Sequence, residues 1–335
     1  MKVVISGPTG VIGHAIIEEC LAARDEVLAI CRTGSKRNAA LPKGREGFRI
    51  IECDLKDYGE LAEEIAGREK TVIDERYDVF YHLAWNGTVG ADRMDTTMQE
   101  ANVRHALDAV RLAHTLGCNT FIGAGSQAEY GRVEGILTPD TPTHPENEYG
   151  RCKRRAGIET RKMCQGLGLR HIWARVLSVY GPFDGENSMV TSSLRKMIAG
   201  EDVSFTAGEQ MWDYLYASDA GRAFRLMGEK GIDGKTYVLG SGECRRLKDY
   251  IRIMTEEVKY AGRPGIGDLP YAERQVMYLQ ADITDLRKDT GFAPEKDFRE
   301  GIQNTIEYLK ENSEQADRAK ETGDKKRRRD RNEES

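Results

Sequence analysis

The chain has 335 residues and a net charge of −5 at neutral pH, so it has no excess of positive charge with which to collect nucleic-acid phosphates. Seven cysteines without a C-x-x-C pair favour reduced thiols, and no apolar run approaches the length that spans a bilayer. A strand begins at the second residue, so no signal peptide is expected and the predicted location is the cytoplasm.

Strands and helices alternate through the first half of the chain. The predicted strands are KVVIS, EVLAIC, FRIIEC, DVFYHLA, NTFIGAG and HIWARVLSVYG. The predicted helices run from Val11 to Ala23, Leu61 to Ala66 and Thr97 to Leu116, followed by one that carries Tyr149. Such alternation predicts an α/β fold, with a doubly wound parallel sheet covered by helices on both faces.

The pattern loosens after Gly181. GKTYVLG, GRPGIGDLPYA and TGFAP read as turns between small elements, and WDYLYASD is expected to return to the first sheet. We therefore expect a dinucleotide-binding domain over residues 1–180 and a smaller C-terminal α/β substrate lobe over 181–310. Residues 311–335 hold many charges of both signs and no large apolar residue, which predicts a solvated tail or a frayed helix.

A glycine loop, GPTGVIG, follows the first strand and opens the first helix. Glycines in this context let a pyrophosphate approach backbone N–H groups at the positive end of a helix. The spacing is G-x-x-G-x-x-G rather than G-x-G-x-x-G, and the alternative is a tight strand–helix turn without a ligand. The predicted cofactor contacts in this loop are Gly7, Thr9, Gly10, Val11, Ile12 and Gly13.

The end of the second strand, AICRTGSKR, lacks the acidic residue that usually meets the adenosine ribose of NAD. Arg32 and Ser35 instead offer positive charge and a hydroxyl where a 2′-phosphate would lie, with Lys36 and Arg37 nearby. NADP is therefore the predicted cofactor, with NAD as the alternative. The alternative for the loop itself is an exposed basic segment with no ligand.

Three residues form a candidate catalytic set: Ser126 in GSQAEYG, and Tyr149 and Lys153 in a Y-x-x-x-K spacing. A helix places Tyr149 and Lys153 one turn apart on the same face. Tyr149 would protonate the oxygen that hydride transfer leaves on a ketone, Lys153 would lower the pKa of the phenol, and Ser126 would hydrogen-bond the same oxygen. Tyr149 is the only one of 14 tyrosines with a lysine four residues later.

Together with CDL, HLAWNG, RVLSVYGP, WDYLYASD and TDLRKDTGFAP, these motifs make residues 1 to about 310 resemble the extended short-chain dehydrogenase/reductase family, in its nucleotide-sugar epimerase/dehydratase/reductase branch. The resemblance implies a Rossmann-type sheet and a homodimer formed through a four-helix bundle by the helices around Thr97 to Leu116 and Tyr149 to Gln165. It also implies cofactor contacts from Asp54, Leu55, Leu83, Ala84, Trp85, Asn102, Lys153 and Val176.

Two departures from the family pattern bear on the substrate. Dehydratases of the family carry an Asp-Glu pair where this chain has Gln127 and Ala128, and Glu129 comes one residue later. Trp212 stands where relatives commonly have an arginine that touches a diphosphate, so Arg274 is the candidate replacement, with Arg195 as a weaker one. The predicted substrate contacts are Asn86, Gln127, Tyr180, Asn187 and Arg274.

Three functions remain open on the sequence. The first is an NADP-dependent oxidoreductase that reduces a 4-keto sugar nucleotide, and the second is a nucleotide-sugar 4-epimerase. The third is a non-catalytic dinucleotide-sensing protein, against which the intact Ser126, Tyr149 and Lys153 set argues. The six histidines show no metal-ligand spacing, so no metal is expected. The expected partner is a nucleoside-diphosphate sugar, and neither nucleic acid nor membrane is expected to bind.

Overall fold

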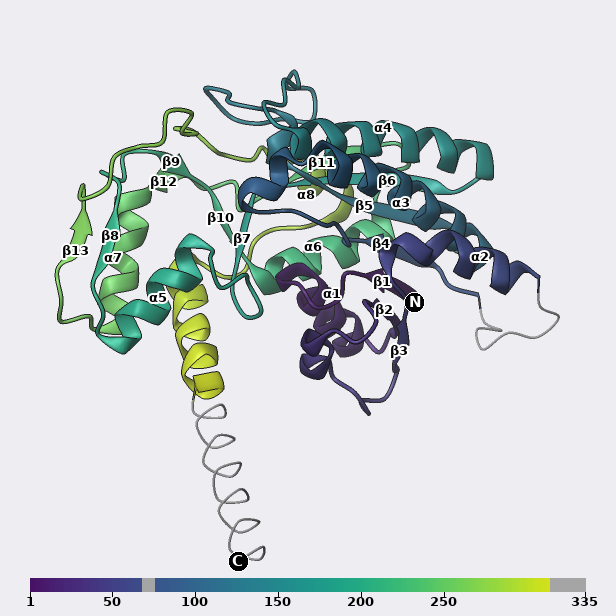
Figure 1. Cartoon of the computed structure of the whole chain (residues 1–335), viewed down its shortest axis with the longest axis horizontal. Coiled ribbons are helices and arrows are strands. Elements are labelled where there is room, and N and C mark those ends of the chain that lie inside the picture. The colour runs from purple at the N-terminus through teal and green to yellow at the C-terminus, as the bar shows by residue number, and fades with distance from the viewer. Residues whose placement is uncertain (68–75, 314–335) are drawn as a thin grey trace, which may run out of the picture.

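The computed structural model describes residues 1–67 and 76–313. Its centre is a seven-stranded, wholly parallel sheet with the strand order β11-β6-β5-β4-β1-β2-β3 (Figure 1). The strands of this sheet are β1 (Lys2–Ser6), β2 (Glu26–Cys31), β3 (Phe48–Glu52), β4 (Val79–His82), β5 (Thr120–Ser126), β6 (Arg170–Val176) and β11 (Thr236–Leu239). This is the doubly wound, Rossmann-type arrangement that the alternation of elements predicts.

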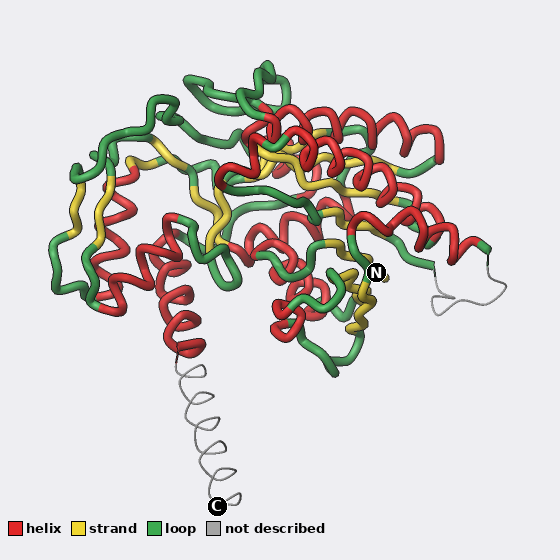
Figure 2. The backbone as a smooth tube through the Cα atoms, viewed as in Figure 1, coloured by secondary structure: helices red, strands yellow, loops and turns green. Residues whose placement is uncertain are grey.

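Apolar residues cover both faces of the sheet, because successive side chains of a strand point to opposite faces. In β1, Val3 and Ile5 belong to one core cluster and Val4 to another, and all three are fully buried. One face is covered by α1 (Val11–Ala22) and α6 (Ala217–Lys230), and the other by α2 (Tyr58–Ala66), α3 (Thr96–Thr115) and α4 (Glu148–Leu167) (Figures 1 and 2). Two buried faces explain the near-continuous apolar strands.

The strand order reverses at β1, which lies between β2 and β4. Ligands of open α/β sheets bind beside the carboxyl ends of the strands at such a point. Here the loops that follow β1 and β4 touch. Gly7 has φ +72°, and a Cβ at this position would lie 2.8 Å from the backbone nitrogen of Ala84. Glycine is required there for both conformation and space.

A smaller lobe lies beside the carboxyl edge of the sheet. It contains α5 (Met189–Ala199), α7 (Leu247–Val258) and a last helix over residues 298–313, while α8 (Thr284–Thr290) packs against β11 and α6. Three two-stranded pairs complete it. Two are parallel, β7 (Ser178–Tyr180) with β10 (Tyr214–Tyr216) and β8 (Val203–Phe205) with β13 (Pro264–Ile266). The third, β9 (Met211–Trp212) with β12 (Arg245–Arg246), is antiparallel.

Two sequence predictions about this half need correction. WDYLYASD does not rejoin the main sheet, because its strand β10 pairs with β7 alone; its last residues begin α6, which covers the sheet. The segment that does rejoin the sheet is GKTYVLG, read from the sequence as a turn; it holds β11, which pairs with β6 at the sheet edge. A four-residue strand that lies between two glycines is too short for periodicity to distinguish it from a turn.

The buried side chain of Asp213 connects separate loops of the lobe. Its carboxylate is fully buried and accepts hydrogen bonds from the backbone N–H groups of Ser241, Gly242 and Ala281 and from the Ser241 hydroxyl, at 2.7–3.0 Å. Burial raises the pKa of Asp213, and these hydrogen bonds oppose that rise. Asp213 of the WDY segment therefore has a structural role.

The charged tail predicted over residues 311–335 lies outside the described residues from residue 314 onward. No helix in residues 1–67 or 76–313 is both long and apolar enough to cross a membrane.

Candidate functional site

A groove runs along the carboxyl edge of the sheet, on both sides of the loop that follows β1. One part has a volume of about 520 Å³, the other of about 240 Å³, and they share Gly7 and Trp85. The larger part is lined by Thr9, Arg32, Ser35, Arg37, Asp54, Leu55, Ala84 and Asn86, among others. The smaller is lined by Gly10, Val11, Ile12, Gly13, Leu83, Ser126, Tyr149, Lys153 and Val176, among others.

The glycine loop fits a dinucleotide pyrophosphate. Helix α1 begins after Gly10 without any side-chain cap, so its first N–H groups are left for another acceptor. A Cβ at Gly10 would meet no atom closer than 3.8 Å, which leaves the groove side of the loop open. A Cβ at Gly13 would instead lie 2.5 Å from the carbonyl oxygen of Gly7, so Gly13 packs the helix against the loop.

The loop after β2 carries the residues predicted to meet the adenosine ribose. Arg32 is exposed and lines the larger part of the groove together with Ser35. Asp54 accepts a hydrogen bond from the backbone N–H of Thr33 at 3.0 Å, which anchors this loop against the segment after β3. Arg37 donates to the carbonyl oxygen of Thr9 at 2.8 Å, so a second guanidinium reaches the glycine loop.

Ser126, Tyr149 and Lys153 meet in the smaller part of the groove. Ser126 ends β5, and helix α4 begins after Asn147, whose side chain accepts a hydrogen bond from the backbone N–H of Gly150 at 2.8 Å. A Cβ at Gly150 would lie 2.3 Å from the carbonyl oxygen of Ala128. Glycine therefore lets the first turn of α4 pack closely against the turn that follows Ser126.

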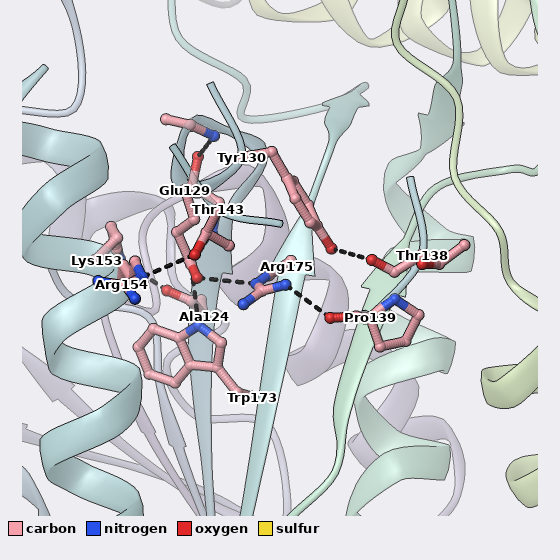
Figure 3. Close-up of polar contacts among 12 residues, drawn as sticks. Ala124, Glu129, Tyr130, Thr138, Pro139, Thr143, Lys153, Arg154, Trp173 and Arg175 are labelled. Carbon is pink, nitrogen blue, oxygen red and sulfur yellow. Dashed lines mark hydrogen bonds and ion pairs between the residues drawn. The ribbon is translucent and has the colours of Figure 1, made fainter. Parts of the chain in front are cut away.

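Lys153 is buried, and its ammonium points toward the sheet. Nζ donates to the carbonyl oxygen of Ala124 at 2.8 Å and lies 3.8 Å from the centroid of the Trp85 ring (Figure 3 shows the contact with Ala124). Burial lowers the pKa of Lys153 to about 7, and the Glu129 carboxylate opposes that shift. The Lys153 Nζ lies 5.9 Å from the centroid of the Tyr149 ring.

Tyr149 lies between aromatic, hydroxyl and cationic neighbours. Trp85 meets it edge-on, with ring centroids 6.3 Å apart, and Arg93 stacks over its ring at 4.7 Å. Burial raises the pKa of Tyr149, while hydrogen bonding to Ser126 and the positive charge of Arg93 lower it. The further lowering of this pKa by Lys153 that the sequence predicts stays a prediction.

Glu129 takes part in a buried network of hydrogen bonds (Figure 3). One carboxylate oxygen accepts hydrogen bonds from the backbone N–H of Ser126 and from the indole of Trp173, both at 2.9 Å, and the other pairs with Arg175 at 2.9 Å. Arg175 also donates to the carbonyl oxygen of Pro139 at 3.1 Å. Gly125 makes room for the network, because a Cβ there would lie 2.3 Å from the Trp173 indole nitrogen.

Asn102 is placed outside the groove lining. It is buried, and its side-chain amide donates to the carbonyl oxygen of Asn86 at 2.8 Å and accepts from the Asn86 N–H at 3.0 Å. Gln99, one turn earlier in α3, accepts a hydrogen bond from the Trp85 indole at 2.8 Å. Asn102 thus shapes the loop that carries Trp85 and Asn86 and does not line the groove itself.

The predicted substrate contacts are scattered. Asn86 lines the larger part of the groove, and Gln127 is half-buried beside Ser126. Tyr180 is buried in the core of the lobe and donates to the carbonyl oxygen of Phe298 at 3.2 Å, so it faces away from the groove. Asn187 lines a separate cavity of about 520 Å³ with Arg195, and Arg274 is exposed.

Two charged residues of the site escaped the sequence analysis. Glu129 was seen only as an acid displaced from the dehydratase position, although an acid beside a strand-end serine is a signal for capping. Arg93 comes from the 3-10 turn η3 (Gly90–Met94), and a lone arginine in an irregular loop carries no sequence signal.

The family model "NAD dependent epimerase/dehydratase family" matches residues 3–240, which is most of the chain. Among curated proteins, the dTDP-glucose 4,6-dehydratase of Escherichia coli is 23% identical, with 94% of this chain and 95% of that protein aligned.

Two solved structures share the fold. The UDP-glucose 4-epimerase of Thermotoga maritima with UDP-glucose superimposes with a TM-score of 0.81 at 22% identity, covering 93% of this chain and 99% of that one. The UDP-glucuronic acid 4-epimerase of Bacillus cereus in complex with NAD gives 0.77 at 18% identity, covering 93% and 99%. With the family model spanning the sheet, the groove and the Ser126, Tyr149 and Lys153 set, the chain belongs to the NAD dependent epimerase/dehydratase family.

Proposed function

We propose that this chain is an NADP-dependent oxidoreductase that reduces a 4-keto sugar nucleotide. The observation that carries the proposal is the state of the side chains next to Ser126. Gln127 and Ala128 carry no acid, and the following carboxylate, Glu129, is held by Ser126, Trp173 and Arg175. Elimination of water needs one group to take a proton and another to protonate the leaving hydroxyl. Chemistry limited to hydride and proton transfer fits this site better.

The chain's own residues have separable roles in such a reduction. A bound dinucleotide would supply the hydride. Tyr149 would donate its phenolic proton to the carbonyl oxygen of the substrate, and Ser126 would hydrogen-bond that oxygen as it becomes negative. Trp85 and Lys153, which are in contact with each other and both line the groove, would position the cofactor.

The cofactor preference rests on the loop after β2. Arg32 and Ser35 line the groove, and Arg37 reaches the glycine loop. A charge-assisted contact with a 2′-phosphate contributes roughly 1.5–3 kcal/mol, or about ten- to a hundredfold in affinity. We expect NADPH to bind more tightly than NADH, and Arg32→Ala to remove most of that preference. Calorimetric titration of both cofactors measures it, and equal affinities in the unaltered protein would contradict this choice.

A homodimer is also part of the proposal. Helices α3 and α4 pack side by side on one face of the sheet and are the expected contributors to a four-helix bundle. Ile158, on α4, is 42% exposed, which is consistent with a helix face that pairs with a second copy. Sedimentation velocity of the protein and of Ile158→Glu tests this state directly.

The reaction is tested by its stoichiometry. With a panel of 4-keto-6-deoxy sugar nucleotides, we expect one NADPH consumed per product formed, followed by absorbance at 340 nm and by chromatography of the sugar nucleotide. Consumption without a changed sugar nucleotide, or no consumption with any member of the panel, would reject the reductase.

A 4-epimerase is the second candidate. Its support is the likeness of this fold to solved 4-epimerases, among them the Thermotoga maritima protein. An epimerase oxidises and re-reduces its substrate with a retained cofactor, so it would interconvert two 4-hydroxy sugar nucleotides with no net change in NADPH. That outcome in the same experiment would replace the reductase by the epimerase.

A further inference from the structure

Glu129 is a buried carboxylate that the proposed reaction does not use as an acid. Only 1% of its side chain is exposed, and it pairs with Arg175, whose side chain is 13% exposed. Withdrawing two charges from water costs free energy, and replacing such a pair by apolar residues is often neutral for stability. Stability alone is therefore a weak reason for an ion pair beside the groove.

The Glu129 carboxylate holds the backbone of Ser126. Its Oε1 accepts a hydrogen bond from the backbone N–H of Ser126 at 2.9 Å. The Ser126 Oγ in turn accepts from the backbone N–H of Ala128 at 3.2 Å, so Ser126 and Glu129 cap each other across the turn η4 (Gln127–Glu129). This reciprocal cap fixes both the backbone and the hydroxyl oxygen of Ser126 at the point where β5 ends.

The surroundings of Glu129 are shaped for this placement. The Trp173 indole donates to the same carboxylate oxygen at 2.9 Å. A Cβ on any of three glycines would lie 2.8 Å or less from the Trp173 side chain, so glycine is needed there for the indole to lie against β5 and α4; the three are Gly123, Gly125 and Gly157. Two neutral N–H donors therefore meet one oxygen of the carboxylate.

Arg175 holds the other oxygen of the carboxylate (Figure 3). Its Nε donates to Oε2 of Glu129 at 2.9 Å, and its Nη1 donates to the carbonyl oxygen of Pro139 at 3.1 Å. Arg175 lies opposite Gly125 in the ladder between β5 and β6. The ion pair therefore ties the turn that follows Ser126 to the neighbouring strand of the sheet.

We propose that Glu129 is a positioning residue for the reaction: while Arg175 holds one oxygen of its carboxylate, the other fixes Ser126 so that the serine hydroxyl faces the substrate. This proposal rests on the proposed function, in which Ser126 hydrogen-bonds the substrate oxygen as it becomes negative. Ser126 lines the smaller part of the groove, and both oxygens of Glu129 are occupied by protein donors behind it. Glu129 therefore acts through Ser126, whose effect depends on a preformed position.

The test separates the hydrogen bond to Ser126 from the charges of the ion pair. Two double variants are compared, Glu129→Gln with Arg175→Met and Glu129→Met with Arg175→Met. Both lack the ion pair, so any effect of the lost charges on stability or on neighbouring groups is common to them. The glutamine variant keeps an acceptor oxygen for the Ser126 N–H, whereas the methionine variant has none. Glutamine is therefore expected to rescue what methionine removes.

Two measurements read the position of Ser126. Without substrate, hydrogen exchange of the Ser126 amide, relative to that of the Ile122 amide in the same strand, should be roughly tenfold or more faster in the methionine variant than in the glutamine variant. With the substrate found by the stoichiometric screen, kcat should be about tenfold lower in the methionine variant and KM should agree within about twofold, because the serine contact strengthens in the transition state. In a Ser126→Ala background the two variants should have equal turnover, since Glu129 acts through that side chain.

Asp25→Asn is the matched control. Asp25 is also a buried carboxylate, 4% exposed, and it pairs with an arginine, Arg225, at 2.9 Å. It directly precedes β2 and so lies at the amino edge of the sheet, away from the groove at the carboxyl edge. Its loss should lower the stability of the fold, because a buried guanidinium loses its partner. The exchange ratio of Ser126 and kcat should stay within about twofold of the unaltered protein.

Equal exchange ratios or equal turnover in the two double variants would overturn the proposal, and so would a difference in turnover that persists in Ser126→Ala. If the double variants do not fold, Glu129→Gln and Glu129→Met are compared with Arg175 in place. A Ser126 amide that exchanges as fast as an exposed amide in the unaltered protein overturns the proposal without any variant. Failure of the proposed reduction is a separate outcome: a protein that leaves NADPH unused with every sugar nucleotide rejects the reductase, while the exchange of the Ser126 amide still decides whether Glu129 holds this turn.

Discussion

The two sides of the groove are built differently. On the sheet side, Ser126 lies at the end of a strand, and Tyr149 and Lys153 lie in the first two turns of one helix, so the topology brings them together. On the lobe side, Arg274 and Asn187 are exposed residues of irregular segments, and Tyr180 is turned into the lobe core. Under the proposed function, the sheet side would carry the chemistry, and the choice of substrate would fall to irregular segments of the lobe.

The strongest test of the sheet side is Tyr149→Phe. The change removes one hydroxyl from a preformed pocket, so turnover should fall by roughly a hundredfold or more, in line with general-acid contributions. Cofactor affinity should hardly change, because the phenol is expected to contact the substrate. Steady-state kinetics with the substrate found by the stoichiometric screen, together with cofactor titration, measure both effects. Near-full turnover would move the acid to another residue.

The buried network behind Ser126 gives the next largest effect. Glu129→Gln removes the charge that pairs with Arg175 while it keeps the shape of the side chain, and an uncompensated buried guanidinium should lower the free energy of unfolding by about 2–3 kcal/mol. The matched control is Glu146→Gln. Glu146 pairs at 2.9 Å with Arg132, which is half exposed, so this change should lower the free energy of unfolding by less than about 1 kcal/mol. Urea unfolding distinguishes the two. Equal losses would mean that Glu129 stabilises the site no better than a surface residue.

The fold and the clustering of Ser126, Tyr149 and Lys153 were open to prediction from sequence because both depend on local patterns. Apolar alternation specifies parallel strands, a glycine loop specifies the first turn, and Y-x-x-x-K specifies one helix face. The strand β11 was missed because its four residues lie between glycines. Arg93 was missed because its partner, Tyr149, is 56 positions away along the chain and no periodic pattern joins them.

The lobe was harder to predict from the sequence, because little of its structure depends on local patterns. Its elements are short, and its core assembles from β7, α5, α7 and the last helix, which are far apart in the sequence. Asp213 illustrates the point, because its four hydrogen bonds hold loops at Ser241 and Ala281 that lie far from it in the sequence. Long-range hydrogen bonding of this kind leaves no periodic trace.

A pH experiment sharpens the account of Lys153. Its pKa falls from an ordinary value of about 10.5 to about 7 in the folded chain. Between these values the unfolded chain binds a proton that the folded chain does not, so stability rises with pH in that window and the cost of the buried charge is fully present below pH 7. The free energy of unfolding of the unaltered chain, relative to that of Lys153→Met, should therefore rise by roughly 1–2 kcal/mol from pH 6.5 to 8.5. Unfolding in urea without cofactor measures it, and a flat difference would place the Lys153 pKa near its ordinary value.

The smallest expected effect belongs to the lobe. Arg274 is exposed. If it meets the diphosphate of the substrate, it does so where solvent screens the contact, so Arg274→Ala should raise KM by about two- to fivefold with turnover unchanged. Arg263→Ala is the control, because Arg263 is an exposed arginine that pairs with Asp268 within the lobe. A loss of turnover in Arg274→Ala comparable with that of Tyr149→Phe would show that the lobe takes part in the chemistry, and it would erase the division between the two sides of the groove.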